Sequence, residues 1–247
     1  MIASSTVPSP KRQRLGRVAL SVLVVAASVA LAWAPQPALG QEQAAAQKYT
    51  SSTNFQAWRG SHEIRTGPGT VTGVGYVHSM QVDVGAVGGN FVAIGTAKGA
   101  GAPGPNSSCV DRYSGTWNVY TDGMAFGTYF CHDEVFNAYT AGDDVPFTIN
   151  YGDCPGDLGA RWRLYMGGNF HQCVNQGSST GSRVSVMLET TGTSLVDRNI
   201  DVKYTGLEYL IGSWVDLENA NLSPVDNFYT VTAPANGKVN AFLTPLD

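Results

Sequence analysis

Residues 117–131 read Trp-Asn-Val-Tyr-Thr-Asp-Gly-Met-Ala-Phe-Gly-Thr-Tyr-Phe-Cys, and this stretch decides the fold class. Trp117 and Val119 alternate with Asn118, which is typical of a β-strand with one face in a core. Asp122-Gly123 follows as a common two-residue hairpin turn, because Gly accepts the positive φ of a type I′ turn. The aromatic residues after this turn predict a returning strand. The stretch therefore predicts an aromatic β-hairpin around which the domain is built.

The same period-two alternation recurs along the chain and predicts further strands at Val71–Val84, Asn90–Ala97, Val145–Tyr151, Arg161–Met166 and Ser182–Thr190. A single helical turn is expected within Asp133–Gly142, and Gly206–Leu217 is ambiguous between helix and strand. Many short strands separated by Gly-rich turns favour a sandwich or jelly roll. We therefore expect residues 54–247 to form one all-β domain, an antiparallel β-sandwich of jelly-roll or concanavalin-like type, stabilised by disulfides.

Residues 1–40 have the three regions of a secretory signal peptide. Basic residues precede the uncharged apolar run Val18–Ala34, and Ala38-Leu39-Gly40 supplies a small-residue cleavage site. The alternative is an uncleaved membrane anchor, since the run is near the lower limit of about 17 residues for a membrane span. We expect a secreted protein, extracellular or associated with the cell surface, without a membrane span after cleavage. Residues 41–53, rich in Gln, Ala and Ser, are expected to form a flexible arm.

The charge balance argues against two classes of partner. The whole chain has a net charge of −4, and the signal region removes basic residues but no acidic ones. The exported part is therefore more acidic than the whole chain. An acidic domain is a poor candidate for binding nucleic acid or an anionic membrane.

The four cysteines, Cys109, Cys131, Cys154 and Cys173, all follow the signal region. An even number in an exported chain predicts two disulfides, and three pairings are possible. We favour Cys109–Cys131 with Cys154–Cys173, because each pair closes a local loop. A zinc site is the rival interpretation, but the usual C-x-x-C and H-x-x-x-H spacings are missing from the sequence.

The sequence lacks the common catalytic and metal-binding motifs. It contains no H-E-x-x-H and no D-x-D-x-D calcium loop. His132-Asp133-Glu134 could hold a cation, but neighbouring residues on a strand point to alternate faces, so a solvated turn is favoured. No metal and no cofactor are predicted.

Five segments occur in a characteristic order: Asn90–Gly95, Trp117–Gly123, Gly127–Cys131, Gly142–Tyr151 and Arg161–Gly168. This order resembles the glutamic-peptidase sandwiches of the neprosin and eqolisin type. The resemblance implies a β-sandwich and a peptidase that uses a glutamate. Ala93 stands where the pattern has its first acidic residue. The resemblance then implies Glu189 as the carboxylate that activates water and Gln81 as the group that stabilises an oxyanion.

Aromatic side chains supply a second hypothesis, because exposed rings on a sandwich can stack on sugar rings. Successive side chains of a strand point to opposite faces. Tyr120 and Tyr165 lie at positions that point outward, whereas Trp117 and Trp162 point inward and are expected in the core. Together with Trp214, the two tyrosines are the candidate ligand-binding residues. The sequence thus favours a non-catalytic module that binds an extracellular or cell-surface carbohydrate or protein. The alternative is a glutamic-type peptidase or related hydrolase that acts in acid through Glu189.

Overall fold

Two antiparallel sheets make up the computed structural model, which describes residues 42–49, 55–64, 75–85, 90–99, 113–126, 128–156, 158–190, 201–224, 229–232 and 235–243. All of these belong to one compact unit, residues 37–247. The seven-stranded sheet has the order β13 (Asn221–Pro224), β1 (Glu42–Tyr49), β10 (Gly181–Thr190), β3 (Gly75–Val84), β4 (Phe91–Gly99), β5 (Tyr113–Ala125) and β6 (Thr128–Tyr139). The eight-stranded sheet has the order β14 (Tyr229–Val231), β15 (Val239–Leu243), β11 (Asp201–Ile211), β2 (Ala57–Glu63), β7 (Asp144–Asp153), β8 (Ala160–Met166) and β9 (Asn169–Val174), with β12 (Ser213–Asp216) paired to β11.

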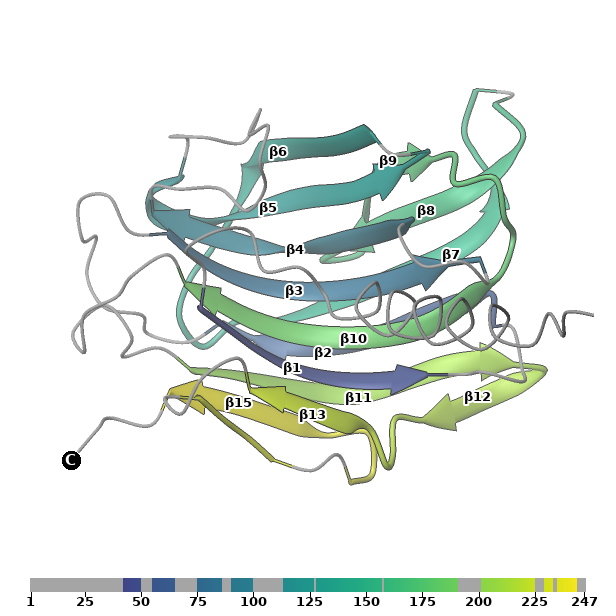
Figure 1. Cartoon of the computed structure of the whole chain (residues 1–247). Coiled ribbons are helices and arrows are strands. Elements are labelled where there is room, and N and C mark those ends of the chain that lie inside the picture. Colours follow the sequence, from purple (N-terminus) through teal and green to yellow (C-terminus); the bar gives the residue numbers. More distant parts are fainter. Residues whose placement is uncertain are drawn as a thin grey trace, which may run out of the picture. The chain divides into compact units, whose positions relative to one another are not determined.

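The sheets stack face to face, so the predicted all-β sandwich is confirmed (Figure 1). One apolar cluster fills the space between them, with Met80, Val82 and Ile94 from the seven-stranded sheet against Trp58 and Phe147 from the other. Alternation along each strand explains the cluster, because every second side chain points to the same face. The predictions that Trp117 and Trp162 lie in the core are confirmed, with 3% and 0% of their surface exposed.

Asp122-Gly123 is not the hairpin turn that the sequence predicted. Both residues lie within β5, and the chain turns after Ala125. A side chain at Gly123 would collide with the carbonyl oxygen of Phe91 and come within 2.6 Å of the Phe130 ring. Close packing, and not a positive φ, therefore requires the glycine.

Three other segments also differ from expectation. Residues 42–49, expected within a flexible arm, form β1 and pair with both β10 and β13. Backbone pairing with the exposed edge of β10 outweighs the polar composition of this segment. Residues of Asp133–Gly142, expected to include a helical turn, continue β6 as far as Tyr139. The ambiguous segment Gly206–Leu217 is extended, as the end of β11 and β12, with a turn at Gly212 (φ 80°).

The predicted disulfide Cys154–Cys173 is confirmed and ties the β7–β8 connection to β9. Cys131 is also disulfide-bonded. Cys109 lies outside the described residues, so its pairing with Cys131 stays a prediction. The expected signal peptide likewise lies outside them. Within the described part of the chain, no helix has the length and apolar character needed to cross a membrane.

Candidate ligand-binding face

The face of the eight-stranded sheet that points away from the other sheet carries a row of side chains in register. Strand pairing places Glu208 of β11 opposite Arg59, Arg59 opposite Thr148, Thr148 opposite Tyr165 and Tyr165 opposite Phe170. Neighbouring strands are about 4.8 Å apart, so the row spans about 19 Å across five strands. We call this surface the outer face. It combines charged, hydroxyl and aromatic groups at one level of the sheet.

A β-bulge opens a hollow beside this row. The register between β2 and β11 shifts between Thr205 and Glu208, and Gly206 has a φ of 58°. A side chain added at Gly206 would meet no atom within 4 Å, so the bulge leaves free space. The hollow has a volume of about 280 Å³ and is lined by Arg59, Gly60, Ser61, Pro146, Phe147, Thr148, Thr205 and Gly206.

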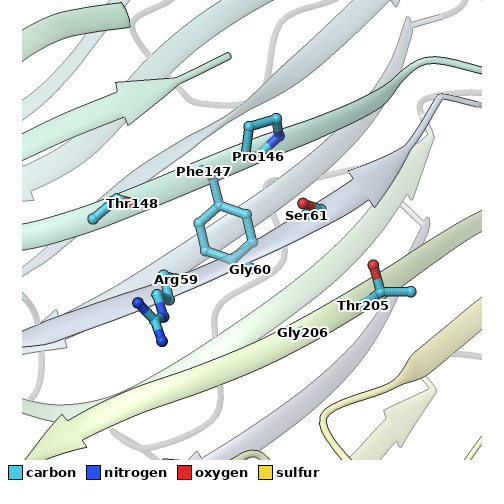
Figure 2. A pocket seen from close by; sticks show the side chains of 8 residues that line it. All are labelled: Arg59, Gly60, Ser61, Pro146, Phe147, Thr148, Thr205 and Gly206. Atoms are coloured by element: carbon cyan, nitrogen blue, oxygen red, sulfur yellow. The ribbon is translucent and has the colours of Figure 1, made fainter. Parts of the chain in front are cut away.

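Figure 2 shows how the lining is arranged. The Phe147 ring lies between β2 and β7, with the hydroxyl-bearing Ser61, Thr148 and Thr205 on the strands around it. Hydroxyls can donate and accept hydrogen bonds. Phe147 is 2% exposed and belongs to the core cluster, so its ring closes the bottom of the hollow but offers little surface to a ligand. The hollow therefore presents mainly its polar rim.

Arg59 is held on two sides. Its Nε and Nη2 atoms each lie 2.7 Å from Glu208 Oε2. Its guanidinium carbon lies 3.8 Å from the centroid of the Trp214 ring, a cation–π contact. One face of Trp214 is therefore already occupied, and the ring positions Arg59 beside the hollow.

Tyr165 and Phe170 form an aromatic pair at the other end of the row. Their ring centroids are 5.6 Å apart and the ring planes meet at 65°, an edge-to-face contact. Phe170 is 41% exposed, a high value for a phenylalanine, and Tyr165 is half-buried. Arg163 is fixed nearby, because its Nε donates to Asn150 Oδ1 at 3.0 Å.

The structure brings two of the three predicted aromatic ligand residues to one face. Tyr165 and Trp214 both lie on the outer face, on β8 and β12. Tyr120 points away from the other sheet as its parity predicted, but only 1% of it is exposed. It packs with Val77 and Ala97, and its ring lies over Gly95, where a Cβ would come within 2.7 Å of it. The prediction that Tyr120 is an exposed platform is wrong for this reason.

The two predicted catalytic residues lie on neighbouring strands of the seven-stranded sheet, at different levels. Gln81 is opposite Ser185, whereas Glu189 is opposite Val77, four residues further along β10. At the usual rise per residue this offset is about 13 Å. The Gln81 amide donates to Asp83 Oδ1 at 2.7 Å, and Asp83 in turn forms a 2.6 Å ion pair with Arg183. The Gln81 amide is thus engaged within its own strand.

Ala93, which replaces the expected carboxylate, lies directly between two polar residues of that sheet. It is opposite Gln81 on one side and Asp122 on the other. Asp122 accepts a 2.9 Å hydrogen bond from the Tyr129 hydroxyl. Sequence reasoning assigned Asp122 to a turn and so missed a carboxylate on this surface.

The space between the sheets holds an unusual polar cluster. The Thr96 hydroxyl lies 3.0 Å from His62 Nε2 and 3.5 Å from His78 Nδ1, and all three residues are fully buried. The His78 ring stacks on Trp117 with a centroid distance of 4.3 Å. Burial lowers the pKa of His62 to about 3, and a hydrogen bond to the Val145 backbone opposes this change. Burial, and then the neighbouring His62, hold the pKa of His78 well below its usual value.

Among the residues that the structure describes, no group of three or more His, Cys, Asp or Glu side chains could hold a metal ion. His132, part of the cation candidate, is exposed on β6. The side chains of Asp133 and Glu134 lie outside the described part.

Comparison with solved structures relates the fold to known sandwiches. Scytalido-glutamic peptidase with a peptide-based transition-state analogue superposes with a TM-score of 0.53 and 12% identity, covering 83% of this chain and 98% of that one. A second structure of the peptidase, with a transition-state analogue inhibitor, has a TM-score of 0.53 and 10% sequence identity. It also covers 83% of this chain and 98% of that one. An endo-glucanase of glycoside hydrolase family 16 from Bacteroides ovatus reaches 0.35 at 10% identity, covering 81% of this chain and 77% of that one, too low a score to support an argument.

No protein-family model and no curated protein matches the sequence. At such low identity, the peptidase likeness shows the fold alone.

Proposed function

We propose that the protein is an exported, non-catalytic module whose outer face binds carbohydrate. Sugar rings have apolar C–H faces and hydroxyl edges, and sites for them combine aromatic rings with hydrogen-bonding groups. The outer face offers this combination. The disulfide Cys154–Cys173 fits an oxidising compartment outside the cytoplasm.

The observation that carries the proposal is the hollow at the Gly206 bulge in line with the Tyr165–Phe170 pair. β-Bulges are frequent next to functional sites, where they redirect side chains. Here the bulge places a residue without a side chain next to Glu208, at one end of the polar and aromatic row. An aromatic pair with an exposed member, Phe170, beside a hollow is also the kind of surface that marks a binding site on a soluble protein.

Substitution of Tyr165 by Ala is expected to weaken binding to polysaccharide by about tenfold or more. Removal of one aromatic side chain that stacks on a nucleic-acid base costs about 1–3 kcal/mol, and we expect a loss of similar size for a stacked sugar ring. The measurement is affinity electrophoresis of the purified protein in gels that contain cellulose-derived glucan, xylan, mannan or pectin.

Phe126→Ala is the matched control, because Phe126 is 69% exposed and lies at the β5–β6 turn of the other sheet. It should migrate like the wild type. Retention of Tyr165→Ala at the wild-type level would refute the outer-face site. The ligand would be a protein and not a carbohydrate if the wild type bound no polysaccharide but bound immobilised collagen in a way that depends on Tyr165.

The alternative function is a glutamic-type peptidase that uses Glu189 with Gln81. The offset between these residues and the Gln81–Asp83 hydrogen bond argue against a shared catalytic water. We therefore expect no cleavage of denatured casein that depends on Glu189, at any pH from acid to neutral. Cleavage by the wild type that Glu189→Gln abolishes would establish the peptidase, whereas cleavage that survives the substitution would exclude Glu189.

A further inference from the structure

We infer that the ligand of the outer face is an uncharged polysaccharide chain, which lies across the strands from the Gly206 hollow to the Tyr165–Phe170 pair. This inference rests on the proposed function and specifies the ligand class and its path. It is carried by two observations, the compensation of the charges next to the hollow and the geometry of the row.

The cationic groups next to the hollow are paired. Arg59 contacts Glu208 at 2.7 Å, and Lys203 of β11 lies 3.5 Å from Glu63 of β2. Each pair has a net charge of zero. The electrostatic attraction of an anionic sugar to this edge of the site is therefore weak. The net charge of −4 for the whole chain repels polyanions further. An uncharged glycan uses the hydrogen-bonding capacity of these groups without needing their charge.

The row also sets the length and direction of the ligand. The hollow is near the lower limit of small-molecule pockets, about 300 Å³, so it suits a single sugar ring. Arg59 and Tyr165 are two strands apart, about 10 Å, with Thr148 between them. A single ring held beside Arg59 leaves Phe170 out of contact, because Phe170 lies three strands away, about 14 Å. A chain of several sugars that crosses the strands can contact both.

Trp214 has a positioning role in this arrangement. Its ring carries the Arg59 guanidinium on one face, which directs the donors of Arg59 toward Glu208 and the hollow. Glu208 then has a specific effect that a purely structural residue would lack. It cancels the charge of Arg59, so its removal should change which polysaccharides bind and not only how strongly they bind.

The test is Glu208→Gln, compared with the wild type on neutral glucan, xylan and mannan and on anionic polygalacturonate and alginate. The wild type should be retained by at least one neutral polysaccharide and not by the anionic ones. The variant should gain about twofold to fivefold in affinity for the polyanions, the range for one exposed ion pair. This gain should vanish in about 1 M NaCl, where the Debye length is about 3 Å. Glu218→Gln, an exposed glutamate outside the row, changes the net charge equally and should gain nothing.

The length of the bound sugar chain tests whether the ligand crosses the strands from the hollow to the aromatic pair. The best neutral hexasaccharide should bind about tenfold more tightly than its disaccharide in calorimetry. Tyr165-dependent binding of polyanions by the wild type would overturn this inference and leave the proposed function intact. Equal affinity for disaccharide and hexasaccharide would overturn the cross-strand path. No binding of any polysaccharide would reject the inference and the proposed function together. Circular dichroism verifies that each variant is folded.

Discussion

A change from pH 7 to pH 3 is expected to remove about 4 kcal/mol from the free energy of unfolding through His62 alone. In the unfolded chain this imidazole takes up a proton below its ordinary pKa of about 6.5, whereas in the folded protein it stays neutral until about pH 3. The unfolded state therefore binds more protons throughout this window, and stability falls as the pH falls. His78 acts in the same direction, because its pKa is also lowered by burial. Urea unfolding from pH 3.5 to 7.5 measures how steeply the free energy of unfolding changes with pH.

Histidine variants separate this effect from general acid sensitivity. The double variant His62→Gln, His78→Gln keeps polar groups beside Thr96 but cannot take up a proton there, so its stability should depend much less on pH. The quantity compared is the change of the free energy of unfolding with pH. It can be compared with the wild type even if the variant is less stable at every pH. His132→Gln, at an exposed position, is the control and should keep the wild-type slope. A wild-type slope in the double variant would show that other groups cause the acid sensitivity.

This acid sensitivity bears on the alternative function. A glutamic-type enzyme with a partly buried carboxylate would work in acid. The lowered pKa values of His62 and His78 predict that the fold is less stable in that range. A binding module has no such requirement and can function near neutral pH, where both imidazoles are neutral in the folded and unfolded states.

Substitution of Trp162 by Ala is expected to cost about 3–5 kcal/mol of stability, because it leaves a large cavity in the core. Trp162 is 0% exposed and contacts the Tyr151 ring edge-to-face at 5.8 Å. Its indole Nε1 also donates to the Ser178 carbonyl at 2.8 Å, which fixes the connection between the two sheets. Urea unfolding at pH 7 provides the measurement.

Trp214→Ala is the matched control, since it deletes the same side chain from a half-buried position on the outer face. Its effect on stability should be clearly smaller than that of Trp162→Ala. Equal losses for the two variants would contradict the assignment of Trp162 to the inner face and Trp214 to the outer face.

Alternation along the strands made much of the fold predictable. Trp117 and Trp162 were placed in the core because their strands alternate apolar and polar residues, and burial follows this parity. Local turn signals were less reliable. Asp122-Gly123 has the composition of a turn, but the glycine is needed for close approach to β4 and to Phe130. Such a contact depends on strands that the sequence alone does not bring together.

The site was predictable only in part for the same reason. Parity identified Tyr165, but it could not distinguish this exposed face from the one where Tyr120 lies over Gly95. Arg59 and Phe170 join the site through strand register, which connects segments more than one hundred residues apart. The bulge at Gly206 gave only a weak signal, a lone glycine inside an ambiguous segment.

The most direct test of the central claim is to map where sugar binds. Amide chemical shifts of the purified, ¹⁵N-labelled protein are followed by NMR while the best-binding neutral hexasaccharide is added. We predict that the shifts of Ser61, Thr148, Tyr165 and Thr205 change most. Changes confined to Gln81, Asp122 and Ser185, on the outward surface of the seven-stranded sheet, would contradict the account.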